Sequence, residues 1–258
     1  MGIRRFFITL ILLFTVAVVF YGNIHWNNKI SSANERKAAA PAAAEKEERA
    51  ASPLTASIPV KEIRNIFQNA EKQNKDVKIV FLGSQALGSG ENSWPELAGR
   101  ELKEKFTNVS YKTLAYPDFT YKQYHASDKV QELIAEKADI VIFEPFSLNN
   151  NGELSTETVF SGIQKTIKTA KEAKKNTLFI LQPTHPIPNA TIYPDQVDEL
   201  KSFAKTEGYL YLDHWTNWPD YGTSEIDDYL TEDNSAPSDK GHKIWADSVL
   251  SMFMKDPE

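Results

Sequence analysis

The stretch VKIVFLGSQALGSG at residues 77–90 decides the fold of this 258-residue chain. Its first six residues are β-branched or apolar apart from Lys78, which predicts a buried strand. The strand ends abruptly at Gly83 and Ser84, and the glycines at 88 and 90 mark a sharp turn. A serine at the carboxyl end of a buried parallel strand is exposed to a ligand, so this stretch predicts a candidate site as well as a strand.

Apolar runs alternate with amphipathic runs through the rest of the chain from about residue 60. Short apolar runs predict further strands, and periodic apolar positions predict helices. The strands are expected at residues 77–82, 109–114, 139–143, 177–181 and 209–212, and the helices at residues 60–73, 94–106, 121–137, 156–175, 194–206 and 240–254. Such alternation predicts an α/β domain over residues 59–258, in which helices flank a parallel sheet.

The N-terminus carries a separate topological signal. Arg4 and Arg5 precede an uncharged apolar run at residues 6–21. An apolar segment of about 20 residues can span a bilayer once, and the arginines favour a cytoplasmic N-terminus. We therefore predict that residues 1–26 are a signal-anchor of a single-pass cell membrane protein whose C-terminal domain is extracytoplasmic. Cleavage in the Ala-rich stretch 38–44, which would give a secreted protein, is the alternative.

The amino-acid composition excludes several kinds of site and partner. Residues 27–58 are rich in Ala, Lys, Glu and Ser and predict a solvated linker. The chain has no cysteine, which excludes disulfides, thiol catalysis and cysteine-ligated zinc. Its formal charge is -6, and basic clusters such as residues 171–175 stand beside acids at helical spacing, so nucleic acid is not an expected partner.

Polar residues follow each predicted strand, where the loops of a parallel sheet meet at one edge. These residues are Ser84 and Gln85 after the first strand, Asp118 after the second, Asn149, Asn150 and Asn151 after the third, Thr184 and His185 after the fourth, and Asp213 and His214 after the fifth. The sequence therefore predicts a polar site at the carboxyl edge of the sheet. Nearby Trp215, Trp218 and Tyr221 could form an apolar rim for sugar rings or acyl chains, or pack in the core.

The Gly-Ser turn, the Asn-rich loop and the segment from Asp233 to Ala246 together resemble the SGNH (GDSL-type) hydrolases, especially envelope-associated members. The resemblance spans residues 77–253. It implies a three-layer α/β/α sandwich with a five-stranded parallel sheet, in which a serine cleaves esters with the help of an imidazole, a carboxylate and oxyanion donors. The implied partner is an acylated carbohydrate or lipid of the cell envelope, and neither a cofactor nor a metal is implied.

The family's first blocks can be matched to this chain residue by residue. Ser84 is the implied nucleophile, because Gly88 and Gly90 follow it at the family's spacing. Counting from Gly83 instead places Gln85 at the nucleophile position. Asn149 and the backbone amide of Ser84 are the implied oxyanion donors. Without the resemblance, Ser84 is equally a turn serine that binds backbone amides, and the Asn-rich loop is a turn.

In the family's last block the catalytic pair is Asp-x-x-His. Asp233 matches the Asp, whereas the histidine position falls on Ala236, which cannot accept a proton. His242 with Asp239 or Asp233 is the substitute pair that we carry forward as catalytic candidates, and a structural role near the helix start is the alternative for His242.

Two other histidines leave further alternatives open. His185 and His214 on strand-end loops could approach the cleft or pack in the core. Together with Asp213 they could also form a metal site. Asp213 and His214 are neighbours in the sequence, however, so their side chains point in different directions, and we predict no metal.

Two functions of different classes follow from these matches. The first is ester hydrolysis on envelope carbohydrate or lipid, with Ser84 as nucleophile and Asn149 as oxyanion donor. The second is a catalytically silent binding domain that kept the cleft and lost the base. The first is the prediction, and the second is its alternative, which is supported by Ala236, the altered Gly-Asp-Ser block and Asp118, at a position where the family has glycine. A structural spacer without a pocket is a third possibility.

Overall fold

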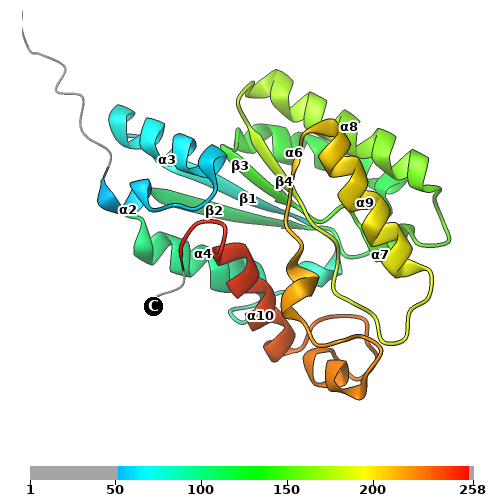
Figure 1. Cartoon of the computed structure of the whole chain (residues 1–258). Coiled ribbons are helices and arrows are strands. Elements are labelled where there is room, and N and C mark those ends of the chain that lie inside the picture. Colours follow the sequence, from blue (N-terminus) through cyan, green and yellow to red (C-terminus); the bar gives the residue numbers. More distant parts are fainter. Residues whose placement is uncertain (1–51, 256–258) are drawn as a thin grey trace, which may run out of the picture. The chain divides into compact units, whose positions relative to one another are not determined.

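Five parallel strands form the centre of the molecule, which is a computed structural model that describes residues 52–255 (Figure 1). The strands are β1 (Val77–Gly83), β2 (Val109–Ala115), β3 (Ile140–Phe143), β4 (Leu178–Leu181) and β5 (Leu210–Tyr211). They are ordered β2-β1-β3-β4-β5, and every neighbouring pair is parallel. The predicted parallel five-stranded sheet is confirmed. The predicted membrane segment at residues 1–26 lies outside the described residues.

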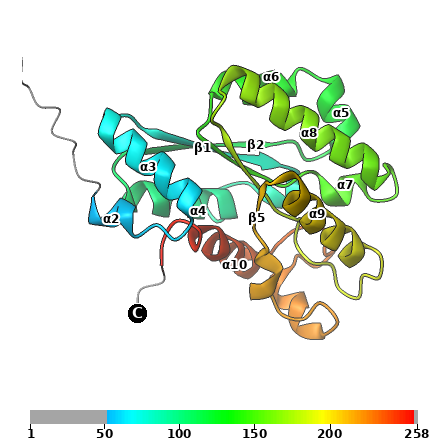
Figure 2. The same cartoon turned by 45° about the horizontal axis from the view of Figure 1, so that its top comes forward.

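Helices cover both faces of this sheet (Figure 2). One layer contains α2 (Pro53–Ala56), α3 (Lys61–Gln73), α4 (Trp94–Lys105) and α10 (Asp239–Leu250). The other contains α5 (Tyr121–Ala126), α6 (Lys129–Glu136), α8 (Thr156–Ala173) and α9 (Tyr193–Glu207). Each layer packs on its own apolar core, so successive residues of β1 are buried on opposite faces. This double burial explains why residues 79–82 of β1 are a continuous apolar run.

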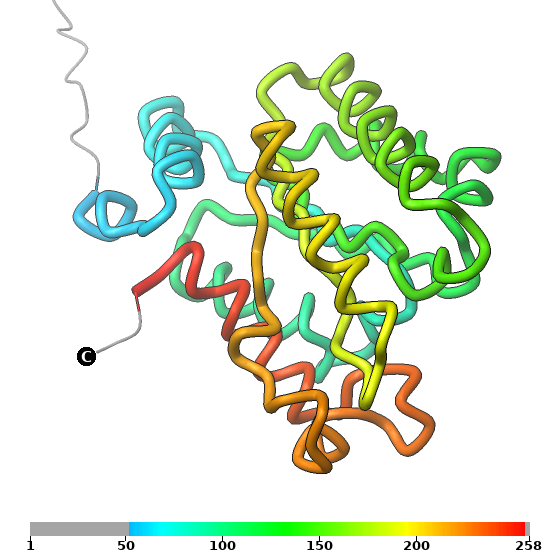
Figure 3. The backbone as a smooth tube through the Cα atoms, turned by 45° about the vertical axis from the view of Figure 1, so that its right-hand side comes forward, coloured from blue at the N-terminus to red at the C-terminus, as the bar shows by residue number. Residues whose placement is uncertain are grey.

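Short elements connect the strands to these helices at the carboxyl edge. They are η1 (Gln85–Leu87) after β1, α7 (Ser147–Asn150) after β3, and η2 (His214–Asn217) and η3 (Ser224–Tyr229) after β5. Helices α8 and α9 lie next to each other on the same face, as Figure 3 shows. The edge is therefore built from these short elements together with longer loops at residues 182–192 and 230–238.

The helix predicted at residues 121–137 is two helices, α5 and α6, so the prediction of one continuous helix was wrong. Thr120 and Gln123 form a capping box that starts α5. Ser127 ends it in an extended conformation (φ -100°, ψ 170°), and its hydroxyl accepts a hydrogen bond from the backbone N–H of Lys129. Serine competes for backbone hydrogen bonds in this way, which interrupts the helix.

The folded part begins before residue 59, where the domain was predicted to start. Helix α2 lies within the predicted linker, and Thr55 in it donates to the carboxylate of Glu71 on α3 (2.8 Å). Ile58 is fully buried in the core. These contacts add residues 52–58 to the domain. Within residues 52–255, no helix combines the length and the apolar character needed to cross a bilayer.

Candidate functional site

Ser84, the implied nucleophile, is buried in the turn after β1 and is 1% exposed. Its hydroxyl oxygen accepts a hydrogen bond from the N–H of Ala86 (3.3 Å), so Ser84 caps the short helix η1. Its own N–H donates to the carboxylate of Glu144 (2.9 Å). This is the geometry of a turn serine, one of the two roles that the sequence left open.

Gln85 extends from the same turn toward Asn149 on α7. Its side-chain amide donates to the side-chain oxygen of Asn149 (2.8 Å). The amide nitrogen of Asn149 then donates to the carbonyl oxygens of Pro117 (2.7 Å) and Phe119 (3.0 Å). The Gln85–Asn149 bridge thus joins the loops after β1, β2 and β3. Both N–H bonds of the predicted oxyanion donor are directed at backbone carbonyls.

Glu144 was not among the candidate site residues, yet its carboxylate organises the edge. The side chain is fully buried and accepts hydrogen bonds from the N–H groups of Ser84 (2.9 Å) and Ser147 (2.7 Å). A Cβ on Gly83 would lie 2.9 Å from its Oε2 atom, so this position requires glycine. The available sequence signal was a charged residue placed between the buried strand β3 and Pro145.

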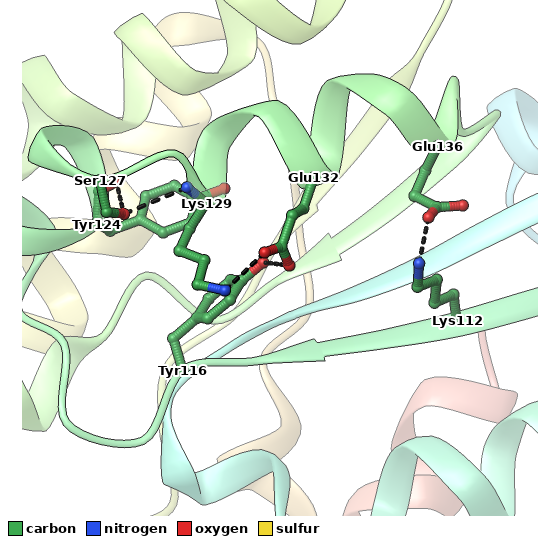
Figure 4. Close-up of polar contacts among 7 residues, drawn as sticks. All are labelled: Lys112, Tyr116, Tyr124, Ser127, Lys129, Glu132 and Glu136. Atoms are coloured by element: carbon green, nitrogen blue, oxygen red, sulfur yellow. Dashed lines mark hydrogen bonds and ion pairs between the residues drawn. The ribbon is translucent and has the colours of Figure 1, made fainter.

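The loop after β2 is held from the other side by α6 (Figure 4). The hydroxyl of Tyr116 donates to the carboxylate of Glu132 (3.0 Å), which also pairs with Lys129 (2.6 Å). The Lys129 ammonium lies 5.5 Å from the centre of the Tyr116 ring. Burial raises the pKa of Tyr116, so its hydroxyl stays protonated and can donate. Asp118, in the same loop, is exposed to solvent.

His242, the implied substitute base, is buried between the turn after β1 and the start of α4. Its Nδ1 accepts a hydrogen bond from the N–H of Trp94 (3.3 Å), which places the ring proton of the neutral form on Nε2. A Cβ on Gly88 would lie 2.7 Å from that Nε2 atom. Burial lowers the pKa of His242 to about 4, although the nearby Asp239 opposes this effect. The lone pair that a base would use is therefore engaged.

The two candidate acids lie on the surface. Asp233 accepts hydrogen bonds from the hydroxyl of Thr231 (2.7 Å) and from the hydroxyl (2.8 Å) and N–H (3.1 Å) of Ser235, and these bonds lower its pKa to about 2. Asp239 accepts from the side chain of Asn92 (3.3 Å). Within the described residues, no hydrogen bond joins either carboxylate to a histidine.

Ala236, at the family's histidine position, lies in a turn that closes on itself. Its carbonyl oxygen accepts from the N–H of Thr231 (2.9 Å), and its own N–H donates to the Thr231 hydroxyl (3.2 Å). The adjacent Pro237 forms a bridge with Leu230. The turn is thus closed by its own hydrogen bonds, and the methyl group of Ala236 brings no proton acceptor to the edge.

The strand-end histidines are fully buried. His214 accepts from the indole N–H of Trp218 (3.0 Å) on Nδ1, and its Nε2 donates to the carbonyl of Pro183 (2.9 Å). Its ring stacks on Trp245 with the centroids 4.2 Å apart. Burial lowers the pKa of His214 to about 3. Both ring nitrogens of His214 are occupied by hydrogen bonds within the core, in agreement with the expectation that this histidine packs in the core.

His185 differs, because one of its nitrogens has no partner. Its Nε2 lies 3.3 Å from the carbonyl oxygen of Asn234, and burial lowers its pKa to about 4. Its Nδ1 is one of four buried polar atoms at this edge without a hydrogen bond in the described residues. The others are Gln85 Oε1, Gln182 Nε2 and Thr184 Oγ1. All four atoms are enclosed, and ordered water is the partner that such buried groups usually have.

Within the described residues, no three His, Asp or Glu side chains are grouped so as to hold a metal ion. The edge therefore offers amides, a hydroxyl and neutral imidazoles. It can donate and accept hydrogen bonds, but the contacts above do not connect a serine, a histidine and a carboxylate.

No family model matches the sequence, and no curated protein matches it. Solved structures match the fold. A protein assigned to the lipolytic G-D-S-L family from Desulfitobacterium hafniense is 20% identical, with a TM-score of 0.59 over 69% of this chain and 100% of that chain.

TesA is 14% identical, with a TM-score of 0.57 over 68% of this chain and 97% of that chain. A family 3 carbohydrate esterase from Clostridium thermocellum is also 14% identical, with a TM-score of 0.55 over 68% and 94% of the two chains. The topology, the strand order and these matches agree with the resemblance carried by the sequence. The described domain has the fold of the SGNH/GDSL-type hydrolases.

Proposed function

We propose that this chain is a catalytically silent domain of SGNH fold that binds an acylated carbohydrate or lipid of the cell envelope at the carboxyl edge of its sheet. The observation that carries the proposal is the hydrogen bond from the Trp94 N–H to His242 Nδ1. It occupies the lone pair with which the substitute base would have to remove a proton from serine.

Serine attack on an ester requires a base within hydrogen-bond reach of the hydroxyl. Ser84 instead binds the N–H of Ala86. Ala236 has no acceptor, and low pKa values make His242 and His185 weak bases at neutral pH. The Asn149 amide, which would stabilise an oxyanion, binds two carbonyls. Apart from His185 Nδ1, each component of ester hydrolysis is thus missing or engaged elsewhere.

Ligand binding is supported by what the edge retains. The unpaired atoms of Gln85, Gln182, Thr184 and His185 include both a donor and an acceptor, and none carries a charge. All four atoms are buried, so a ligand would reach them only after a turn at the edge moved. Hydroxyl-rich or ester-bearing ligands match such groups better than anions do. Solved structures of this fold include an acetyl esterase and a carbohydrate esterase, which supports a carbohydrate ester as the ligand.

The proposed cellular location rests on the sequence. Arg4 and Arg5 before the apolar run at residues 6–21 support a single membrane span with the domain on the extracytoplasmic side. A membrane-bound binding domain would meet envelope carbohydrates or lipids there without being released.

Ester hydrolysis is the second candidate function, and one observation favours it. His185 Nδ1 has no partner, and donation from Nε2 to Asn234 would leave a lone pair on Nδ1. In this case Ser84 would be the nucleophile after its turn opened, with Asn149 as oxyanion donor.

One experiment separates the two functions. The purified full chain is tested for hydrolysis of p-nitrophenyl acetate and butyrate, beside Ser84→Ala and His185→Asn. It is also tested by calorimetry for binding of O-acetylated chitotetraose and its deacetylated parent. Binding of the acetylated sugar without turnover supports the proposal. Turnover that is lost in both variants would establish the esterase instead, and absence of both binding and turnover would refute a carbohydrate-ester ligand.

A further inference from the structure

A groove lies between α8 and α9, and one end of it adjoins α7, the short helix that carries Asn149. Its deepest part is a pocket that encloses about 430 Å³ of free space, some of it open to solvent. Its apolar lining comes from Val159 and Phe160 of α8, Val197 and Leu200 of α9, and Leu154, which precedes α8. Polar side chains of α7 and of the helix starts, such as Asn150 and Gln196, line the rest. The pocket therefore offers a partly open hollow with an apolar side formed by α8 and α9.

Phe160 connects this pocket to two wider hollows on the same surface. Its ring is half-buried and stacks on Phe203 of α9, with centroids 4.3 Å apart and planes inclined by 12°. One hollow extends along α9 from Asp195 to Thr206. At the helical rise of 1.5 Å per residue this is about 16 Å, the length of about five residues of extended chain. The groove is long enough for a peptide segment.

The sides of the groove are acidic. Glu157 on α8 and Asp195, Asp198 and Glu199 on α9 line the two hollows, and no described lining residue is Lys or Arg. All four acids are exposed, and none forms an ion pair or a hydrogen bond within the described residues. Their charges are thus available to a partner, and they would repel an acidic one.

We propose that the α8–α9 groove binds a basic peptide segment of a partner protein. An apolar side chain of the segment occupies the pocket beside Phe160, and flanking Lys or Arg side chains pair with the carboxylates of Asp198 and Glu199. Charge complementarity selects this occupant, and the length of the groove favours a peptide over a small amine. The pocket adjoins α7 of the carboxyl edge, but the proposal does not require a ligand at the Gln85–Asn149 bridge.

The test uses the full chain in zwitterionic nanodiscs, with empty nanodiscs as the blank. Fluorescein-labelled KKFLKK is titrated by anisotropy, together with EEFLEE, which reverses the charges, and KKSSKK, which lacks the apolar pair. We expect saturable binding of KKFLKK and binding at least about tenfold weaker for the other two peptides. Absence of saturable KKFLKK binding, or equal binding of EEFLEE or KKSSKK, overturns the proposal.

Two matched variants locate the binding. Asp198→Lys/Glu199→Lys reverses two charges in the groove, and Glu101→Lys/Glu104→Lys makes the same charge change at exposed positions of α4 in the opposite layer. The groove variant is expected to weaken KKFLKK binding by about tenfold, and the α4 variant to leave it unchanged. Thermal melting verifies that both variants are folded. Equal weakening by the two variants would show that net charge alone attracts the peptide, which also overturns the proposal.

Discussion

Lowering the pH from 7 to 5 should strongly destabilise this domain, because three buried histidines must stay neutral in the folded state. Burial lowers the pKa of His185 and His242 to about 4 and that of His214 to about 3. The ordinary value in an unfolded chain is about 6.5. Between pH 6.5 and 4 the unfolded chain therefore binds more protons, and the free energy of unfolding falls as the pH falls.

The magnitude follows from these values. A pH of 5 lies about 1.5 units below the pKa of a histidine in the unfolded chain, and each unit corresponds to about 1.4 kcal/mol of unfolding free energy. Each histidine thus contributes a loss of about 2 kcal/mol, and the three together about 6 kcal/mol. A typical domain has only about 5–15 kcal/mol of stability. The contacts explain the loss, because a proton added to Nδ1 of His242 or His214 would face an N–H donor.

Urea unfolding at pH 7 and pH 5 measures this effect, and His242→Asn isolates one of the three histidines. The asparagine oxygen can still accept from the Trp94 N–H, but it does not titrate in this range. The variant should lose about 2 kcal/mol less than the unmodified chain between the two pH values. His125→Asn is the control, because His125 is only partly buried and its pKa is lowered less. An unchanged pH dependence in His242→Asn would refute the reasoning.

Three further outcomes are expected. Gly88→Ala should lower the free energy of unfolding by at least about 1 kcal/mol more than Gly90→Ala, as measured by urea unfolding. Both glycines have positive φ, but only a Cβ at Gly88 would meet the His242 ring. Equal losses in the two variants would contradict this explanation. Glu144→Ala should lower the free energy of unfolding by about 2–4 kcal/mol by the same method, because the N–H groups of Ser84 and Ser147 lose their acceptor. A loss below about 1 kcal/mol would show that these N–H groups find another acceptor. The double variant Gln85→Ser/Ala236→His should hydrolyse p-nitrophenyl acetate, whereas neither single variant should. A double variant that is folded but inactive would argue against residues 85 and 236 as the positions of nucleophile and base.

The fold could be predicted from the sequence because its signals are local and repeated. Strands buried on both faces leave continuous apolar runs, and the intervening helices show clear periodicity. The division between α5 and α6 was missed because it depends on how the Ser127 side chain binds the backbone. A serine in that position is compatible with either outcome in the sequence.

The site was less predictable, for a physical reason. Spacing alone located Ala236 and the Asn-rich loop, but spacing could not decide whether Ser84 or Gln85 faces that loop. The answer depends on which side chain caps the turn, and the hydrogen bond to Ala86 assigns this role to Ser84. Glu144 was missed because its partners are backbone N–H groups, which no residue pattern reveals.

The Gln85–Asn149 bridge has a consequence for how such a site changes over generations. Replacing Gln85 alone leaves the Asn149 oxygen without its donor, and replacing Asn149 alone leaves the Gln85 amide without its acceptor. An orphaned polar group at such a position weakens folding before any activity can return. The bridge therefore couples the two positions: a serine introduced at residue 85 gives up the hydrogen bond to Asn149 before any new chemistry at that position can begin.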